Sequence, residues 1–251
     1  MGRLLDFANR VAFGALRDSI PENDAEDIDD DWEERFWERV KAGADYRDLD
    51  LWPRDKFYPR KDYPWKVYGY TKDGKKLRAM PTGTIPWWQL DTLMIHTTDT
   101  GALGPLRGLS IPAHGLISDP GTIGLLHKLN RRLPHGHSAN KFSNGLEVSG
   151  RRTINAAQVE AGRLYIRWWC QTVRQNKALA HVEAGRSIGE AMDNMYPLYI
   201  IPHRHSHKSR RKDPDREVWE ALGEWAIDEG LCKLGRVVGS GQRIPERGQP
   251  W

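Results

Sequence analysis

The stretch that decides the fold, YIIPHRHSHKSRRKDPDREVW, spans residues 199–219. Its apolar beginning is typical of a buried strand, which ends at Pro202, and His203 follows directly. Asp213 comes ten positions after this histidine, in an Asp-Pro turn. An imidazole and a carboxylate are suitable ligands for a divalent ion such as zinc. The stretch therefore indicates a strand that leads into a metal-binding loop.

Two ligands bind zinc poorly, so a third is expected from elsewhere in the chain. The best candidate is His96, which ends a second apolar run, residues 93–95, with the character of a buried strand. His205 and His207 remain alternatives to His203, because alternate residues of an extended chain point to the same side. The sequence thus predicts that two strand ends and one loop converge on one ion.

Residues 87–251 alternate strand-like and helix-like segments, which is typical of an α/β domain. Short apolar runs bounded by turn residues predict the strands. Asn155, followed by Gln158 three positions later, resembles a capping box at the start of a long helix. The predicted strands cover residues 92–96, 113–118, 122–127, 145–148 and the run before Pro202.

Residues 1–85 differ in composition from the rest and are expected to form an extension. Residues 3–17 have apolar side chains at helical spacing, and residues 22–34 hold nine acidic residues, which predicts an amphipathic helix and then a solvated linker. Residues 45–86 mix aromatic and basic side chains. The helix and the aromatic arm are expected to pack on the domain. Docking to a membrane, a cell wall or a virion partner is the alternative.

Composition narrows the class of protein. The chain has 251 residues, enough for one domain of about 165 residues with an extension. No apolar run reaches the roughly 20 residues that span a bilayer, and the charged N-terminus lacks the pattern of a signal peptide, so we expect a soluble protein made in the cytoplasm. Cys170 and Cys232 lack metal-binding spacing and are expected to be reduced thiols.

Charge is unevenly distributed along the chain. Residues 1–80 hold 16 basic and 18 acidic residues, a net charge of −2, whereas residues 81–251 hold 22 and 16, a net charge of +6. All nine histidines lie in the second part. This basic part suits an anionic polymer, either cell wall or nucleic acid, as partner.

Four blocks of sequence carry a resemblance to a known family. They are IHTT around His96, PAHGLISDPGTI from Pro112, HGHSANKFSNGLEVSG from His135 and IIPHRHSHKSRRKDPD from Ile200. In this order they resemble the zinc-dependent N-acetylmuramoyl-L-alanine amidases, which include phage endolysins, cytoplasmic muropeptide amidases and peptidoglycan recognition proteins. The resemblance implies that residues 86–251 form a catalytic domain with a central mixed sheet flanked by helices. Residues 1–85 lie outside the resemblance and are expected to form an irregular, helical N-terminal extension.

The resemblance also implies a cofactor and its ligands. Zn²⁺ would be held by His96, His203 and Asp213, and three protein ligands leave the fourth tetrahedral position open for water. Zinc lowers the pKa of such a water towards about 7 and polarises a scissile carbonyl. The family's second histidine ligand follows its strand directly, which favours His203 over the two later histidines.

The resemblance also implies functional roles for other residues of the four blocks. Glu147, in NGLEVSG, corresponds to a glutamate that acts as general acid and base. Arg211 or Lys212, just before the aspartate ligand, would stabilise the oxyanion of the reaction. His135 and Asn140 would contact the substrate.

The expected reaction is hydrolysis of the amide between N-acetylmuramic acid and L-alanine, with peptidoglycan or a muropeptide as partner. A phage lysin is the expected setting. It would act at the bacterial cell wall after release by a holin or from the virion, and residues 1–85 would supply a virion or membrane contact. The alternatives are a cytoplasmic muropeptide-recycling amidase and a non-catalytic peptidoglycan-binding module. No nucleic acid is expected as partner, because a phosphate-binding basic run requires neither His96 nor Glu147.

Overall fold

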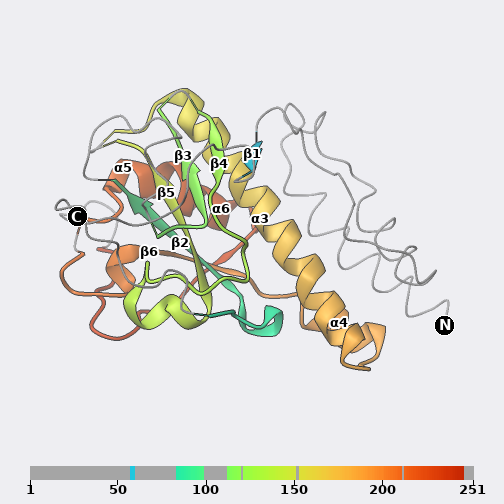
Figure 1. The fold of residues 1–251 in the computed structure, drawn as a ribbon. Coiled ribbons are helices and arrows are strands. Elements are labelled where there is room, and N and C mark those ends of the chain that lie inside the picture. Colours follow the sequence, from blue (N-terminus) through green and yellow to red (C-terminus); the bar gives the residue numbers. More distant parts are fainter. Residues whose placement is uncertain are drawn as a thin grey trace, which may run out of the picture.

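The computed structural model describes residues 57–59, 83–98, 112–119, 121–150, 153–210 and 212–245. The expected N-terminal helix, the acidic linker, most of the aromatic arm and Arg211 lie outside these residues. In the part that is described, one sheet carries helices and loops on its two faces (Figure 1). No helix there combines the length and apolar character that crossing a bilayer requires.

The sheet has seven strands in the order β1-β4-β3-β5-β2-β6-β7. Every neighbouring pair is parallel except β3 and β4, which form an antiparallel hairpin. The expected central mixed sheet flanked by helices is therefore confirmed. The strands are β1 (Phe57–Pro59), β2 (Thr92–Thr97), β3 (Gly115–Ile117), β4 (Ile123–Leu125), β5 (Ser143–Val148), β6 (Tyr199–Pro202) and β7 (Lys233–Leu234).

The longest helix in the described part of the chain is α3 (Ala156–Glu183), which runs beside the sheet (Figure 1). It begins at the predicted capping box: Asn155 Oδ1 accepts from the backbone N–H of Gln158 at 2.9 Å, and Gln158 Oε1 accepts from that of Asn155 at 3.1 Å. The other helices are α4 (Ile188–Asp193), α5 (Arg216–Val218), the π-helix η8 (Trp219–Glu224), α6 (Trp225–Asp228) and the 3₁₀ turns η4 (Trp87–Gln89), η6 (His137–Lys141) and η7 (His203–His205).

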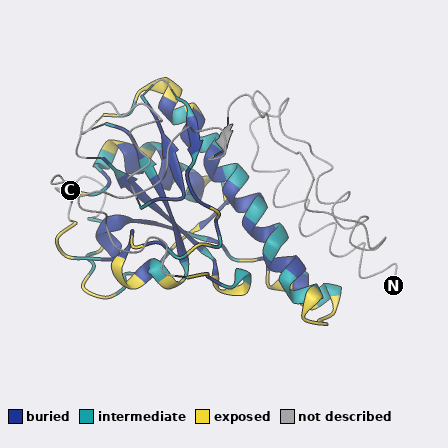
Figure 2. Cartoon of the chain, viewed as in Figure 1, coloured by how far each residue is buried: buried dark blue, intermediate teal, exposed yellow. Residues whose placement is uncertain are grey.

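The central strands are buried (Figure 2), and side chains alternate between the two faces of the sheet. One face packs on α3, where Leu93 and Ile95 of β2 join the main apolar core. The opposite face carries a small cluster with Met94 and Ile201 and is covered by loops and 3₁₀ turns. His96 shares the face of Met94, because the two residues are two positions apart in one strand. The sheet thus separates the core from the residues predicted to carry chemistry.

Asn144 of β5 ties the sheet to α3 by hydrogen bonds. Its Oδ1 accepts from Trp169 Nε1 at 2.7 Å, and its Nδ2 donates to the carbonyl of Leu129 at 2.7 Å. All three residues are buried, and Trp169 and Leu129 belong to the main core. Buried polar groups of this kind are costly to leave unpaired.

We expect Asn144→Ala to lower the free energy of unfolding by about 2–4 kcal/mol, because a buried indole N–H and a buried carbonyl both lose their partner. Urea unfolding followed by tryptophan fluorescence measures the change. The matched control is Asn194→Ala, whose side chain donates to Glu190 at the exposed end of α4 and which should change stability by no more than about 0.5 kcal/mol. Equal losses of stability in the two variants would show that the hydrogen bonds of Asn144 do not stabilise the fold.

Candidate metal centre

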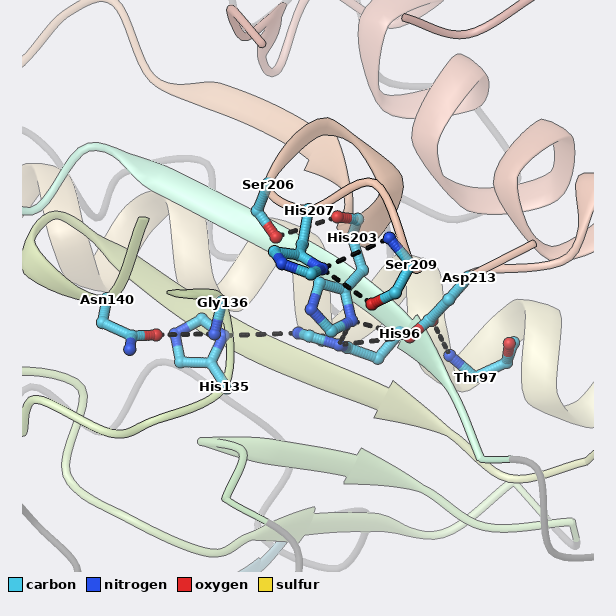
Figure 3. Close-up of polar contacts among 10 residues, drawn as sticks. All are labelled: His96, Thr97, His135, Gly136, Asn140, His203, Ser206, His207, Ser209 and Asp213. Atoms are coloured by element: carbon cyan, nitrogen blue, oxygen red, sulfur yellow. Dashed lines mark hydrogen bonds and ion pairs between the residues drawn. The ribbon is translucent and has the colours of Figure 1, made fainter. Parts of the chain in front are cut away.

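Parallel pairing of β2 with β6 brings two histidines to one edge of the sheet. Ile95 and Pro202 are register partners, and the next residues are His96 at the end of β2 and His203 at the start of η7. Asp213 returns to this point from the loop that follows. Its Oδ1 accepts from the backbone N–H of Thr97 at 2.9 Å (Figure 3), and its carbonyl accepts from the backbone N–H of Arg204 at 2.8 Å.

The three predicted ligands converge on one point (Figure 3). His203 Nδ1 lies 2.9 Å from His96 Nδ1 and 2.6 Å from Asp213 Oδ2, and the latter two atoms are 3.9 Å apart. Both histidines are buried, and 17% of the aspartate side chain is exposed. Among the described residues this is the group of histidine, cysteine and acidic side chains that could hold a metal ion.

This donor set fits zinc. Zinc bonds to nitrogen and oxygen are about 2.0–2.2 Å long, so ligand atoms of a tetrahedral site lie about 3.3 Å apart. The three separations observed here bracket that value. Without metal, the proton on His203 Nδ1 is the one hydrogen available to both His96 Nδ1 and the carboxylate of Asp213. A bound cation would instead accept a lone pair from all three atoms at once.

The pKa values of the cluster show its charge state without metal. Burial and the charge of His96 outweigh the attraction of Asp213 and lower the pKa of His203 to about 4. Burial also disfavours charge on His96, but the carboxylates of Asp213 and Glu147 raise its pKa overall. Burial opposes ionisation of Asp213, yet the hydrogen bond from His203 and the positive charge of His96 hold its pKa well below the usual range. The aspartate is therefore an anion, ready to bind a cation.

Two further histidines lie behind the cluster. His135 Nδ1 is 3.3 Å from His96 Nε2, and its Nε2 is 3.0 Å from the carbonyl of Ser143. His114 accepts from the backbone N–H of Gly145 through Nδ1 at 3.0 Å and donates to the carbonyl of Arg131 through Nε2 at 2.8 Å. Burial lowers the pKa of His114 to about 3 and that of His135 well below its usual value. Both rings are therefore neutral.

Glu147 lies on β5 in register with His96. Register partners in neighbouring parallel strands point to the same face, so the glutamate lies on the metal side of the sheet. It is half-buried, and its charge raises the pKa of His96. The structure thus brings the predicted acid/base residue next to the predicted ligands.

The other predicted residues occupy different positions. Lys212 is exposed on the loop before Asp213, and Arg211 lies outside the described residues. Asn140 accepts from the backbone N–H of Gly136 at 2.5 Å and so holds the turn into η6 (Figure 3). His135 is buried beside His96. The substrate contacts expected of Asn140 and His135 stay predictions.

The alternative ligands lie away from the cluster. His205 is buried, and its Nε2 accepts from the backbone N–H of Ile244 at 3.2 Å. His207 stacks on His137, with ring centroids 4.1 Å apart and ring planes 20° apart. Neither belongs to the group that converges with Asp213. The structure therefore favours His203 as the second histidine ligand.

Two residues near the cluster received no role from the sequence. Arg210 is exposed, and its charge lowers the pKa of His96, His203 and His137. His137 is exposed, its ring centroid lies 6.0 Å from that of His203, and its φ is 49°, a conformation that most side chains avoid. Neither residue stands in a sequence pattern that predicts a ligand.

Comparison with known proteins gives the following similarities. No protein-family model and no curated protein matches the sequence. Among solved structures, the peptidoglycan recognition protein SD of drosophila is 17% identical, covers 72% of this chain and 98% of its own, and gives a TM-score of 0.45. The endolysine N-acetylmuramoyl-L-alanine amidase LysCS from Clostridium intestinale URNW is 13% identical, with coverages of 61% and 92% and a TM-score of 0.41.

A third solved structure is peptidoglycan recognition protein LE in complex with tracheal cytotoxin. It is 14% identical, covers 68% of this chain and 94% of its own, and gives a TM-score of 0.44. At these low identities and scores, only the side chains of this chain itself bear on its function.

The buried neutral histidines predict how stability depends on pH in the metal-free protein. In the folded protein the pKa values of His114 (about 3) and His205 (about 4) lie below the usual 6.5. At a pH between these values and 6.5, the unfolded chain therefore binds more protons than the folded protein. Their contribution is complete above about pH 6.5 and is lost as the pH falls towards 4. His96, whose pKa is raised, contributes with the opposite sign but is outnumbered.

We therefore expect the thermal midpoint of the metal-free protein to fall steadily from pH 7 to pH 4.5, measured by circular dichroism in chelator. His114→Asn keeps an acceptor for Gly145 but cannot be protonated, so it should flatten this dependence. A midpoint that does not change over this range would contradict the assignment of buried neutral rings.

Proposed function

We propose that this chain is a zinc-dependent hydrolase that cleaves the amide between N-acetylmuramic acid and L-alanine in peptidoglycan. The observation that carries the proposal is the convergence of His96, His203 and Asp213, with Glu147 on the same face of the sheet. Two histidines and a carboxylate form a three-ligand set, which is typical of catalytic rather than structural zinc. The substrate is inferred from the order of the four sequence blocks.

In this mechanism the three ligands hold the ion at the edge of the sheet. When bound there, zinc would supply a nucleophile at neutral pH and would polarise the carbonyl of the scissile amide. Glu147 takes up the proton of the attacking water and passes it to the leaving amine, a role that suits a half-buried carboxylate on the same face. A cation of the loop before Asp213, either Arg211 or Lys212, stabilises the oxyanion.

The biological setting we propose is a phage lysin that degrades the cell wall, released by a holin or carried in the virion. Residues 1–85 would then contribute a contact with a virion component or with the membrane. A cytoplasmic muropeptide-recycling amidase is the alternative enzyme, and substrate size separates the two, since a lysin degrades intact sacculi. A peptidoglycan-binding module without activity would bind sacculi and release nothing.

Zinc-loaded protein should release peptides with a free N-terminal L-alanine from purified sacculi, detected by mass spectrometry. Chelation should abolish the release, and His203→Ala should reduce it at least about 100-fold, because two ligands hold zinc poorly. His207→Ala is the matched control from the same loop and should retain activity. Release that survives in His203→Ala but not in His207→Ala would reassign the ligand, and wall binding without release would support the binding module.

Glu147→Gln should lower kcat about 10²- to 10⁴-fold while the zinc content of the dialysed protein stays at one equivalent, because the amide cannot accept the proton. Kinetics on a soluble muropeptide, together with elemental analysis, separate the two effects. Glu160→Gln, an exposed acid on α3, is the control and should leave both unchanged. An unchanged kcat in Glu147→Gln would remove the glutamate from the mechanism.

A further inference from the structure

We propose that His135 is a positioning residue that fixes the tautomer of His96, so that His96 presents Nδ1 to the metal. The proposal rests on the metal centre of the proposed function and adds a residue to it. Its evidence is a continuous path of hydrogen bonds from the backbone of β5 through two imidazole rings to the ligand cluster.

The first step of this path fixes the proton on His135. Its Nε2 lies 3.0 Å from the carbonyl of Ser143, which can only accept a hydrogen bond. The hydroxyl of Ser143, 3.4 Å from the same nitrogen, uses its own hydrogen to donate to the carbonyl of Ala139 at 2.8 Å. Both neighbours of Nε2 are thus acceptors. A neutral His135 therefore holds its proton on Nε2 and carries a lone pair on Nδ1.

The second step transfers this choice to His96. His135 Nδ1 faces His96 Nε2 at 3.3 Å, so this contact is a hydrogen bond only when His96 carries its proton on Nε2. The Nδ1 of a neutral His96 then has a free lone pair. That atom faces His203 Nδ1 and Asp213 Oδ2. A zinc ligand of this kind commonly donates its second ring N–H to a fixed acceptor, and here the acceptor is another imidazole.

The backbone leaves room for this arrangement at one glycine. A Cβ at Gly145 would lie 2.9 Å from His135 Nδ1 and 3.3 Å from His96 Nε2, at the contact between the two rings. Both histidines are buried, with 2% and 6% of their surface exposed, so water cannot readily replace either ring. The sheet and the turn before η6 therefore hold the pair in one geometry.

The same geometry argues against a direct substrate contact by His135. Both ring nitrogens are already used, one by Ser143 and one by His96. A substrate hydrogen bond would have to break one of them inside a buried site. The effect of His135 on catalysis should therefore act through the affinity and orientation of the metal.

The test compares zinc affinity in three variants, measured by competition with a chromophoric chelator. His135→Asn places an amide oxygen near the position of Nδ1 and keeps the acceptor for His96, whereas His135→Gln reaches the position of Nε2 and His135→Phe keeps only the shape. We expect the Gln and Phe variants to bind zinc about 10- to 100-fold more weakly, and the Asn variant to stay within about threefold of the native protein. His181→Phe, on α3 away from the site, is the control.

The second readout is the tautomer itself, from ¹⁵N–¹H correlation spectra of the histidine rings in metal-free protein at a pH above the pKa of His96, where its ring is neutral. His96 should be protonated on Nε2 in the native protein and in His135→Asn, and should show a mixture in His135→Phe. Zinc affinity that is equal in all variants, or a proton on His96 Nδ1 in the native protein, would overturn the proposal. Thermal midpoints verify that each variant is folded.

These results separate the proposal from the proposed function. Native protein that binds zinc with the expected tautomer but releases no peptide from sacculi would refute the amidase and leave the role of His135 standing. An active amidase whose zinc affinity does not change in His135→Phe would refute the role of His135 and leave the proposed function standing.

Discussion

The parallel pairing of β2 with β6 on one side and β5 on the other is the constraint on which the site depends. It places the end of one strand between the ends of two others, so that His96 has His203 on one side and Glu147 on the other. None of these residues is near another in the sequence. A shift of one residue in either pairing would turn the histidine or the glutamate to the opposite face, into the apolar core. The strand register therefore determines whether the site can form.

The loop that returns Asp213 completes the site through the backbone. The carboxylate is held by the N–H of Thr97, the residue after His96, and its own carbonyl accepts from the residue after His203. Asp213 is thus bonded to the residues that follow the two histidine ligands. Both hydrogen bonds come from backbone N–H groups, so Asp213 is held in place without a second charged side chain. The cluster is preorganised for a cation.

The α/β class, the capping box at Asn155 and the strand before Pro202 were predictable because each depends on local patterns of apolar, capping and turn residues. The pairing of His96 with His203 was also within reach, since residues that follow parallel strands tend to meet at one edge. The position of His135 beside His96 could not be predicted from the sequence. Its role follows from a ring packed over Gly145 and from a carbonyl eight residues away, and such contacts leave no periodic signal in the sequence.

The two faces of β2 carry separate duties. Leu93 and Ile95 pack into the core, and His96 serves the site on the other side of the same ribbon. Stability and chemistry are therefore encoded at interleaved positions that share no side-chain partners. A variant of this chain that lost one ligand would keep its apolar layer, and with it the fold. The site can therefore change its chemistry at one position without disturbing the residues that hold the sheet on α3.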